Sequence, residues 1–228
     1  MKTAVIVTTY NRPDALAAVL DGYQAQSTPS FELLVADDGS TENTRAVVEN
    51  FRNRAAFPLK HVWHEDRGFR AAAIRNRAIA ATNADYIIFS DGDCVPATDF
   101  VARHQALAER SWFVAGNRIL LSESFTTRAL AQALPLHRYG LPDWLAAWCK
   151  RDINRLLPLL RRGGTDPRHA RHALHLQGRN HDNSGSHRRP LPRVHREHSG
   201  SGARRPLQRM RGCISTPGER GLCFASIH

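Results

Sequence analysis

Apolar residues in the first half of the chain occur in short continuous runs, and segments of helical spacing separate these runs. Residues 3–9 are apolar or β-branched and are followed by polar residues, which is the pattern of a strand buried on both faces. Further runs of this kind lie at residues 31–36, 59–64, 85–90 and 112–116. Helical spacing of apolar residues is found from residue 13 onward and at residues 41–54, 69–82 and 98–109. The alternation predicts an α/β fold with a mainly parallel sheet and helices on both faces.

Three polar clusters fall where predicted strands end. They are Thr8-Thr9-Tyr10, Asp37-Asp38 and Asp91-Gly92-Asp93. In an open parallel sheet, ligands bind in the crevice outside the carboxyl ends of the strands. We therefore expect the three clusters to lie together on one edge of the sheet.

The turn Asp91-Gly92-Asp93 offers two carboxylates one residue apart. Oxygen ligands of this kind suit Mg²⁺ or Mn²⁺, and such a cation would bridge the phosphates of a nucleotide and stabilise the departing phosphate. We expect Asp93 to be the direct metal ligand because it lies further into the loop, with Asp91 as the second candidate. The alternative is a solvated turn whose carboxylates cap a helix.

Asp38 is the candidate for contact with a nucleoside, because it lies one residue nearer the open crevice than Asp37. A carboxylate at this position can accept hydrogen bonds from a base or a ribose hydroxyl. The alternative is that Asp38-Gly39-Ser40-Thr41 forms only a turn and a helix cap, which is the role we expect mainly of Asp37. No Gly-x-Gly-x-x-Gly pattern follows the first strand, which argues against a dinucleotide-binding turn.

Basic residues surround the start of the alanine-rich helix predicted at residues 69–82. Arg70 and Arg77 are seven positions apart and share a face, whereas Arg75 and Asn76 turn elsewhere. We expect Arg70 and Asn76 to contact a ligand or to support its loop. The alternative is an exposed basic face.

The histidines of the first half receive no chemical role. His61 and His64 are three positions apart in or next to a strand, so they point to opposite faces of the sheet. His104 lies in a predicted helix, where a place on the surface or in the core is expected. The sequence therefore gives no histidine as a catalytic candidate.

The last 68 residues differ in composition from the rest. Residues 161–228 contain fourteen arginines, no lysine, eight histidines and four acidic residues, so they carry +10 of the formal net charge of +11. Only ten of these residues are Val, Ile, Leu, Met, Phe, Trp or Tyr. Such a segment buries too little apolar surface to offset its ordering entropy. We expect it to be disordered or to lie outside the fold.

Cysteine usage and hydropathy bear on the cellular compartment. Cys94, Cys149, Cys213 and Cys223 form no Cys-x-x-Cys pair, a pattern that favours a reducing cytosolic chain over a disulfide framework. A strand-like run follows Met1 almost directly, which argues against a signal peptide. No apolar run approaches the roughly 20 residues that span a bilayer.

Four segments in order along the chain together resemble the family 2 glycosyltransferases of the Rossmann-like GT-A fold. They are Val5-Ile6-Val7-Thr8-Thr9-Tyr10-Asn11-Arg12, Leu34-Val35-Ala36-Asp37-Asp38-Gly39-Ser40-Thr41, Arg75-Asn76 and Asp91-Gly92-Asp93. The stretch Gly68-Phe69-Arg70 and the Asp-Gly-Asp-Cys variant resemble bacterial members that build lipopolysaccharide or capsule, and the chondroitin-polymerase type. The resemblance divides the chain into a sugar-nucleotide-binding domain (1–125), the helical start of an acceptor half (126–160) and the tail (161–228).

The resemblance also implies roles for the candidate residues. Thr8, Tyr10 and Asp38 would hold the nucleoside of a sugar nucleotide, Arg70 would lie near the diphosphate or sugar, Asp91 would contact the ribose or sugar, and Asp93 would bind Mg²⁺ or Mn²⁺. Asn11, Arg12 and Asn76 complete the donor-binding set. The implied reaction moves the sugar to a polysaccharide or lipid-linked acceptor with inversion at the anomeric carbon.

The family often acts at the cytoplasmic face of the membrane, and the segment 141–160 bears on this point. It combines tryptophans and leucines with three basic residues, so it is a candidate interfacial helix. The alternative is burial of these apolar residues against the remainder of an acceptor domain. The expected location is therefore the cytoplasm, with peripheral contact at the inner face of the membrane.

One family feature is missing from this sequence. The family's catalytic base normally lies in a Trp-Gly-x-Glu-Asp-like turn in the second half, but no Glu-Asp pair follows Asp93. The sequence therefore assigns no catalytic base. We hypothesise that residues from about 161 onward are a frameshifted translation. If neither other reading frame of the DNA encodes a Trp-Gly-x-Glu-Asp-like segment, the hypothesis fails.

Two other functions compete with glycosyl transfer. A nucleotidyltransferase also presents carboxylates and a metal to a nucleotide, but it would show a glycine-rich basic loop after the first strand, and residues 8–13 lack glycine. A nucleic-acid-binding protein would act through the basic tail. That tail contains a single aromatic residue, Phe224, so it offers little stacking surface for bases. We do not expect a nucleic-acid partner.

Overall fold

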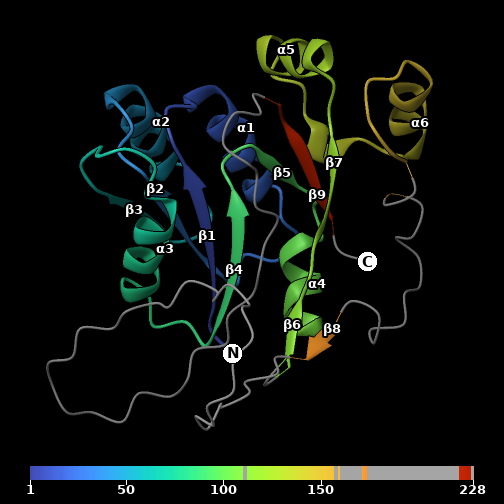
Figure 1. The fold of residues 1–228 in the computed structure, drawn as a ribbon. Helices are drawn as coiled ribbons and strands as arrows, with labels where there is room; N and C mark the ends of the chain where they lie inside the picture. The colour runs from blue at the N-terminus through green and yellow to red at the C-terminus, as the bar shows by residue number, and fades with distance from the viewer. Residues whose placement is uncertain (110–111, 157–158, 160–170, 174–220, 227–228) are drawn as a thin grey trace, which may run out of the picture.

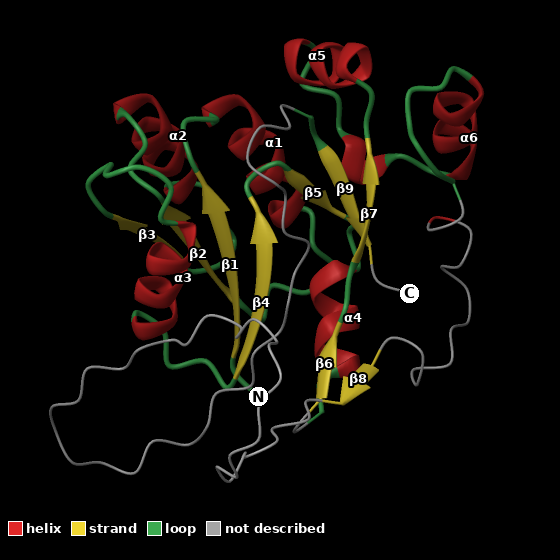
Figure 2. Ribbon diagram, viewed as in Figure 1, coloured by secondary structure: helices red, strands yellow, loops and turns green. Residues whose placement is uncertain are grey.

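The computed structural model describes residues 1–109, 112–156, 159, 171–173 and 221–226. Its central feature is a four-stranded parallel sheet in the order β3-β2-β1-β4 (Figure 1). The strands are β1 (Thr3–Thr9), β2 (Glu32–Asp37), β3 (Leu59–Trp63) and β4 (Tyr86–Asp91). The helices that connect and follow them are α1 (Pro13–Gln24), α2 (Glu42–Arg52), α3 (Ala71–Ala80) and α4 (Phe100–Leu107). The predicted α/β fold with a parallel sheet flanked by helices is confirmed (Figure 2).

Both faces of the sheet are covered, which explains the continuous apolar runs. Alternate residues of β1 enter different hydrophobic clusters: Val5 packs with the residues of α1 and α2, whereas Ile6 packs with Ile74 and Ala78 of α3. Small residues in α3 let this helix lie close to β1 and β2. Because neither face of the central strand β1 meets water, its polar residues Thr3, Thr8 and Thr9 lie at its two ends.

A second, smaller sheet is separate from the first and has three short strands. Its strands are β5 (Cys94–Pro96), β9 (Cys223–Ser226) and β7 (Asn117–Leu120), and β9 lies between the other two, parallel to β5 and antiparallel to β7. A separate antiparallel pair joins β6 (Trp112–Val114) to β8 (Arg171–Ala173). The remaining elements are α5 (Glu123–Ala131), the 3₁₀ helix η1 (Leu136–Arg138) and α6 (Leu141–Cys149).

The expectation for residues 161–228 does not hold for the strand β9. Leu222, Cys223, Phe224 and Ala225 are all buried in the main hydrophobic cluster, and the Phe224 ring lies 4.8 Å from that of Trp144 in α6. The average composition of the tail conceals this run of four apolar residues. Residues 161–170 and 174–220 lie outside the described part of the chain. The frameshift hypothesis for these residues stays a hypothesis.

The interpretation of the cysteines as reduced is wrong for one pair. Cys94 and Cys223 are register partners in the parallel pair β5–β9 and form a disulfide with a Cα–Cα distance of 4.6 Å. Their sequence separation is 129 residues, so spacing along the chain gives no sign of the pairing. Cys149 is an exposed free thiol. Within the described segments, no helix has the length and apolar character needed to cross a membrane.

Candidate functional site

The three polar clusters meet at the carboxyl ends of β1, β2 and β4, as the order of the strands requires. Thr8 pairs with Asp91 of β4, and Thr9 pairs with Asp37 of β2. Backbone hydrogen bonds continue past the strand ends, where Gly92 N–H donates to the Thr8 carbonyl (2.7 Å) and Asp38 N–H donates to the Thr9 carbonyl (3.0 Å). We call this edge of the sheet, with the loops that follow it, the rim.

The turn after β4 has glycine at its centre because nothing larger fits. A Cβ atom on Gly92 would lie 2.9 Å from the Thr8 carbonyl oxygen and 2.9 Å from the Thr9 Cβ. This close approach holds the turn against the end of β1, where Asp91 pairs with Thr8. Asp91 is buried, whereas Asp93 is only half-buried and its carbonyl accepts a hydrogen bond from Cys223 N–H (2.8 Å).

Arg75 links two strand ends from the helix α3. Its Nε donates to Thr8 Oγ1 (2.8 Å) and its Nη2 donates to Asp91 Oδ1 (3.1 Å). The two charged side chains are 20% and 10% exposed, so this ion pair is largely shielded from water. Asp91 is thus partly neutralised within the protein, whereas Asp93 lies closer to solvent. The half-buried carboxylate of Asp93 fits a hard cation such as Mg²⁺ or Mn²⁺, and Asp91 lies within the same turn.

Asp38 makes two hydrogen bonds to the turn between β3 and α3. Its Oδ1 is 2.6 Å from Nε2 of His64, and its Oδ2 accepts from Arg70 N–H (2.9 Å). The Arg70 guanidinium bonds to the carbonyl of Glu65, so it supports its own loop, one of the two roles that the sequence suggested for it. Asp38 therefore ties β2 to this turn.

Asp37 points to the opposite face of the sheet from Asp38, and its contacts support the turn that follows β2. Its Oδ2 is 2.9 Å from His61 Nε2, and its Oδ1 accepts from Ser40 N–H (2.8 Å). Burial alone would raise the pKa of Asp37, but the hydrogen bonds from His61 and Ser40 outweigh it and hold this pKa below its ordinary value. These contacts agree with the turn and cap role expected of Asp37. Gly39 completes the turn with a φ of +99°, a conformation that glycine adopts without strain.

The loop after β1 is fastened to the loop after β2. Asn11 N–H donates to Ser40 Oγ (2.9 Å), and Asn11 Oδ1 accepts from Thr41 N–H (2.9 Å). Arg12 lies at the start of α1 and forms an ion pair with Asp14 (3.0 Å). Asn11 itself has a φ of +48°, so this fastening holds a backbone conformation that is uncommon for residues other than glycine.

Tyr10 connects the same loop to the turn after β3. Its hydroxyl donates to Asp66 Oδ2 (2.8 Å), and Asp66 Oδ1 accepts from Gly68 N–H (3.0 Å). The bond to Asp66 raises the pKa of the Tyr10 hydroxyl. Tyr10 is 49% exposed, so its ring remains accessible from the rim.

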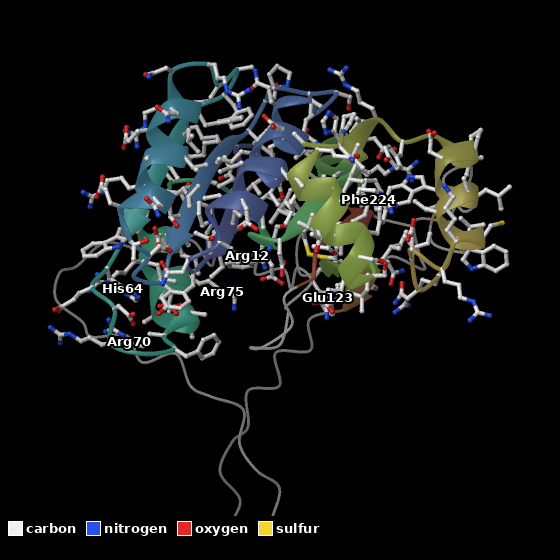
Figure 3. All side chains as sticks on the ribbon, turned by 90° about the horizontal axis from the view of Figure 1, so that it is seen from above. Arg12, His64, Arg70, Arg75, Glu123 and Phe224 are labelled. Atoms are coloured by element: carbon white, nitrogen blue, oxygen red, sulfur yellow. A yellow bond between two sulfur atoms is a disulfide. The ribbon has the colours of Figure 1, made fainter. Side chains whose placement is uncertain are left out.

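The structure gathers most of the residues selected from the sequence. Thr8, Tyr10, Asn11, Arg12, Asp38, Arg70, Asp91 and Asp93 all lie on the rim or on the loops next to it. Asn76 is exposed on α3, and its donor-binding role stays a prediction. Figure 3, which views the molecule from above, shows His64, Arg70 and Arg75 gathered on one side, with Glu123 of α5 across from them.

Sequence reasoning named Arg75 within a motif but gave it no site role, and it gave no role to His64. Arg75 follows the buried Ile74 and is four residues after the buried Ala71, so the helical phase of α3 signals that it faces the sheet. The signal for His64 was weaker, because its partner Asp38 is 26 positions away, directly after the neighbouring strand β2.

Comparison with known proteins adds sequence relatives. A family model described as "Glycosyl transferase family 2" matches residues 4–167. A validoxylamine A glucosyltransferase of Streptomyces hygroscopicus is 35% identical over 100 residues, which is 43% of this chain and 23% of that protein. The hyaluronan synthase of Pasteurella multocida is 35% identical over 107 residues, 46% of this chain and 11% of that one. The chondroitin synthase of Escherichia coli is 32% identical over 105 residues, 46% and 15% respectively. The chain thus spans less than a quarter of each of these relatives.

Among solved structures, a mannosyltransferase from Pyrobaculum calidifontis in complex with GDP-Man and Mn²⁺ is 28% identical and superposes with a TM-score of 0.45. The match covers 50% of this chain and 34% of that one. The Staphylococcus aureus protein TarS in complex with UDP-GlcNAc is 26% identical with a TM-score of 0.43, over 50% of this chain and 34% of that one. These superpositions are partial.

Proposed function

Since the chain belongs to glycosyl transferase family 2, we propose that it transfers a sugar from a nucleotide-sugar donor to a saccharide acceptor. The observation that carries this proposal is the rim, where the Asp91-Gly92-Asp93 turn lies beside the end of β1 and is held there by Arg75. Parallel sheets bind nucleotides at such a rim. The family match also disfavours the nucleotidyltransferase and nucleic-acid-binding alternatives.

We assign the nucleoside to the part of the rim formed by Tyr10 and Asp38. Tyr10 offers an accessible ring, and Asp38 offers carboxylate oxygens next to it. Thr8, Asn11 and Arg12 line the same edge and form the rest of the proposed donor contact. Arg70 and Asn76 complete this set from the turn after β3 and from α3.

We assign the diphosphate of the donor to the turn after β4. A divalent cation, Mg²⁺ or Mn²⁺, would be held by Asp93 with Asp91 beside it, and it would supply positive charge to the departing nucleotide. In the proposed inverting displacement, the acceptor hydroxyl oxygen bonds to the anomeric carbon as the bond from that carbon to the diphosphate oxygen breaks. The hydroxyl proton passes to a base, for which the described residues supply no assignment. Arg75 would keep Asp91 and Thr8 in register throughout.

The class of acceptor is inferred from the names of the relatives. Two of them are synthases of hyaluronan and chondroitin, which are polysaccharides, so we propose a polysaccharide or a lipid-linked saccharide as acceptor. The shared segment is only part of those proteins. Activity of this chain is therefore tested first through donor binding.

Calorimetric titration with UDP, and separately with GDP, in the presence and absence of Mn²⁺ tests the donor site. We expect Mn²⁺-dependent binding of one nucleotide by the wild-type protein and at least about tenfold weaker binding by Asp93→Ala, since each tenfold change corresponds to about 1.4 kcal/mol. Asp85→Ala is the matched control because this exposed aspartate lies at the opposite end of β4. Equal, metal-independent binding by the wild type and Asp93→Ala would overturn the assignment.

We also propose a peripheral contact of α6 with an anionic membrane. This helix buries Trp144 but exposes Leu141, Leu145 and Trp148 to about half of their full surface (53%, 49% and 49%), and Lys150 follows it. Apolar side chains beside a basic residue suit the membrane interface. Co-sedimentation with vesicles of phosphatidylcholine and phosphatidylglycerol tests the contact. Wild-type protein should pellet more than Trp148→Ser, and equal pelleting of the two would contradict it.

A further inference from the structure

His64 is a buried side chain with one strong partner and no assigned role. Its imidazole is 3% exposed, and the carboxylate of its partner Asp38 is 5% exposed. The Nε2–Oδ1 distance of 2.6 Å is that of a charge-assisted hydrogen bond. A bond of this kind is worth more than a neutral one, and its loss leaves a carboxylate in a water-poor environment.

The pairing of His64 with Asp38 follows from the register of the sheet. Asp37 of β2 lies opposite Trp63 of β3. The next residue after each strand, Asp38 and His64 respectively, therefore leaves the sheet beside the other. The neighbouring pair of Asp37 and His61 repeats the chemistry on the opposite face at 2.9 Å. Two consecutive aspartates therefore each have a histidine partner, His61 within β3 and His64 directly after it, but only Asp38 faces the turn after β3.

The hydrogen-bond partners around His64 favour one of its two neutral tautomers. Its Nδ1 is buried and has no hydrogen-bond partner among the described residues. A proton on Nδ1 would be a buried donor without an acceptor, which is costly. The neutral tautomer with its proton on Nε2 fits this environment, because that proton is donated to Asp38.

We propose that His64 is a positioning residue of the donor site, which orients the Asp38 carboxylate for contact with the nucleoside. This inference rests on the proposed function. A carboxylate offers about four lone-pair sites, and the bonds from His64 and Arg70 N–H occupy two of them. The remaining sites accept N–H or O–H groups of the nucleoside. Without the two bonds, the Asp38 side chain would be free to rotate away.

The same two bonds join the donor site to the turn that follows β3. Arg70 N–H and His64 are the two ends of the segment that carries Asp66, the partner of the Tyr10 hydroxyl. Both proposed nucleoside contacts, Tyr10 and Asp38, are thus fastened to one turn of seven residues, 64–70. Loss of the His64 bond is expected to weaken both contacts together.

Titration of the variants His64→Leu and His64→Gln with UDP, or with GDP if that is the nucleotide bound, in the presence of Mn²⁺ tests the inference. The leucine variant should bind at least about tenfold more weakly, the loss expected for a hydrogen bond to a charged group. The glutamine variant still has an N–H donor and should stay within about threefold of the wild type. His104→Leu is the matched control, because His104 is also buried with a hydrogen-bond partner, the Tyr86 hydroxyl, at the opposite end of β4 from the rim. It should lower the melting temperature without changing nucleotide affinity.

The outcomes separate the inference from the proposed function. Wild-type affinity in His64→Leu, or an equal loss in His64→Gln and His64→Leu, would overturn the positioning role while the donor site stands. Absence of Mn²⁺-dependent binding of both UDP and GDP to the wild-type protein would refute the proposed function and the inference with it. If His64→Leu does not fold, His64→Met supplies the apolar comparison at similar volume.

Discussion

The Arg75–Asp91 pair allows a direct test of the rim, because both residues can be changed without altering the backbone. We consider Arg75→Met, which retains most of the side-chain stem, and Asp91→Asn, which retains the shape of the carboxylate. In the wild type, Arg75 donates to Asp91 Oδ1 at 3.1 Å and to Thr8 Oγ1 at 2.8 Å. Either change removes the charge pair, and Arg75→Met also removes the bond to Thr8.

The expected magnitude follows from the exposure of the two side chains. Breaking a fully buried ion pair costs about 3–5 kcal/mol, whereas exposed pairs contribute about 0–1 kcal/mol. Arg75 and Asp91 are 20% and 10% exposed, nearer the buried limit. After a discount for residual solvent screening, we expect each single change to lower the free energy of unfolding by about 2 kcal/mol. The double variant should lose at least about 1 kcal/mol less than the sum of the two.

Urea denaturation followed by circular dichroism at neutral pH, without nucleotide, measures all four proteins of this double-mutant cycle. Arg77→Met is the matched control, since this arginine is exposed on the same helix and its replacement should change the free energy of unfolding by less than about 0.5 kcal/mol. Additive effects of Arg75→Met and Asp91→Asn, within about 0.3 kcal/mol, would refute the linkage. An equal loss in Arg77→Met would show that the helix rather than the pair is responsible.

Three further predictions concern other parts of the fold. Burial lowers the pKa of His104 to about 3, so the unfolded chain takes up a proton that the folded chain does not. The free energy of unfolding should therefore fall by up to about 1.4 kcal/mol per pH unit as the pH is lowered from 6 to 4. Urea denaturation of His104→Phe at several pH values should show a smaller dependence of this free energy on pH. An unchanged pH dependence in His104→Phe would contradict the lowered pKa of His104. Gly39→Ala should lower the free energy of unfolding by at least about 2 kcal/mol, because φ is +99° and the added Cβ would lie 2.5 Å from Asp66 Cα. Gly68→Ala, with φ +80° but nothing within 4 Å of the added Cβ, should cost about 1 kcal/mol in the same urea assay, and equal losses would refute the steric argument. Cys223→Ser removes the Cys94–Cys223 disulfide and should lower the free energy of unfolding by about 4–5 kcal/mol, on the loop-entropy model for a separation of 129 residues. Cys149→Ser, which changes the exposed free thiol, should leave the thermal melt unchanged. A melt of Cys223→Ser like that of the wild type would contradict a stabilising role of the disulfide.

The sequence predicts the central sheet because its signals are local. The run at residues 3–9 is buried on both faces, and this is visible in the run itself as an absence of polar alternation. The convergence of Thr8, Asp38 and Asp91 follows from the same information, since parallel strands end on one edge. The α/β fold and most of the rim could therefore be derived without coordinates.

The parts that could not be derived depend on pairing between distant segments. β9 enters the second sheet between β5 and β7, and no periodic pattern in residues 223–226 specifies those partners. Once β9 lies beside β5, the Cys94–Cys223 disulfide follows from register. The orientation of Arg75 is a different case, because the spacing of the buried residues of α3 indicates that Arg75 faces the sheet. The comparison of Arg70 with Arg77 along the sequence did not use this spacing.

The adjacent acids Asp37 and Asp38 show how one strand end supplies both support and a binding group. Successive side chains of an extended chain point to opposite faces, so the two carboxylates cannot share an environment. The adjacent strand β3 and the residue after it have the same alternation, so His61 bonds to one acid and His64 to the other. Asp37 uses its other oxygen to close the turn at Ser40, which fixes the loop, whereas Asp38 uses its other oxygen to hold the turn that carries the partner of Tyr10. The first pair therefore sets the position of the rim, and the second leaves carboxylate lone pairs available at it.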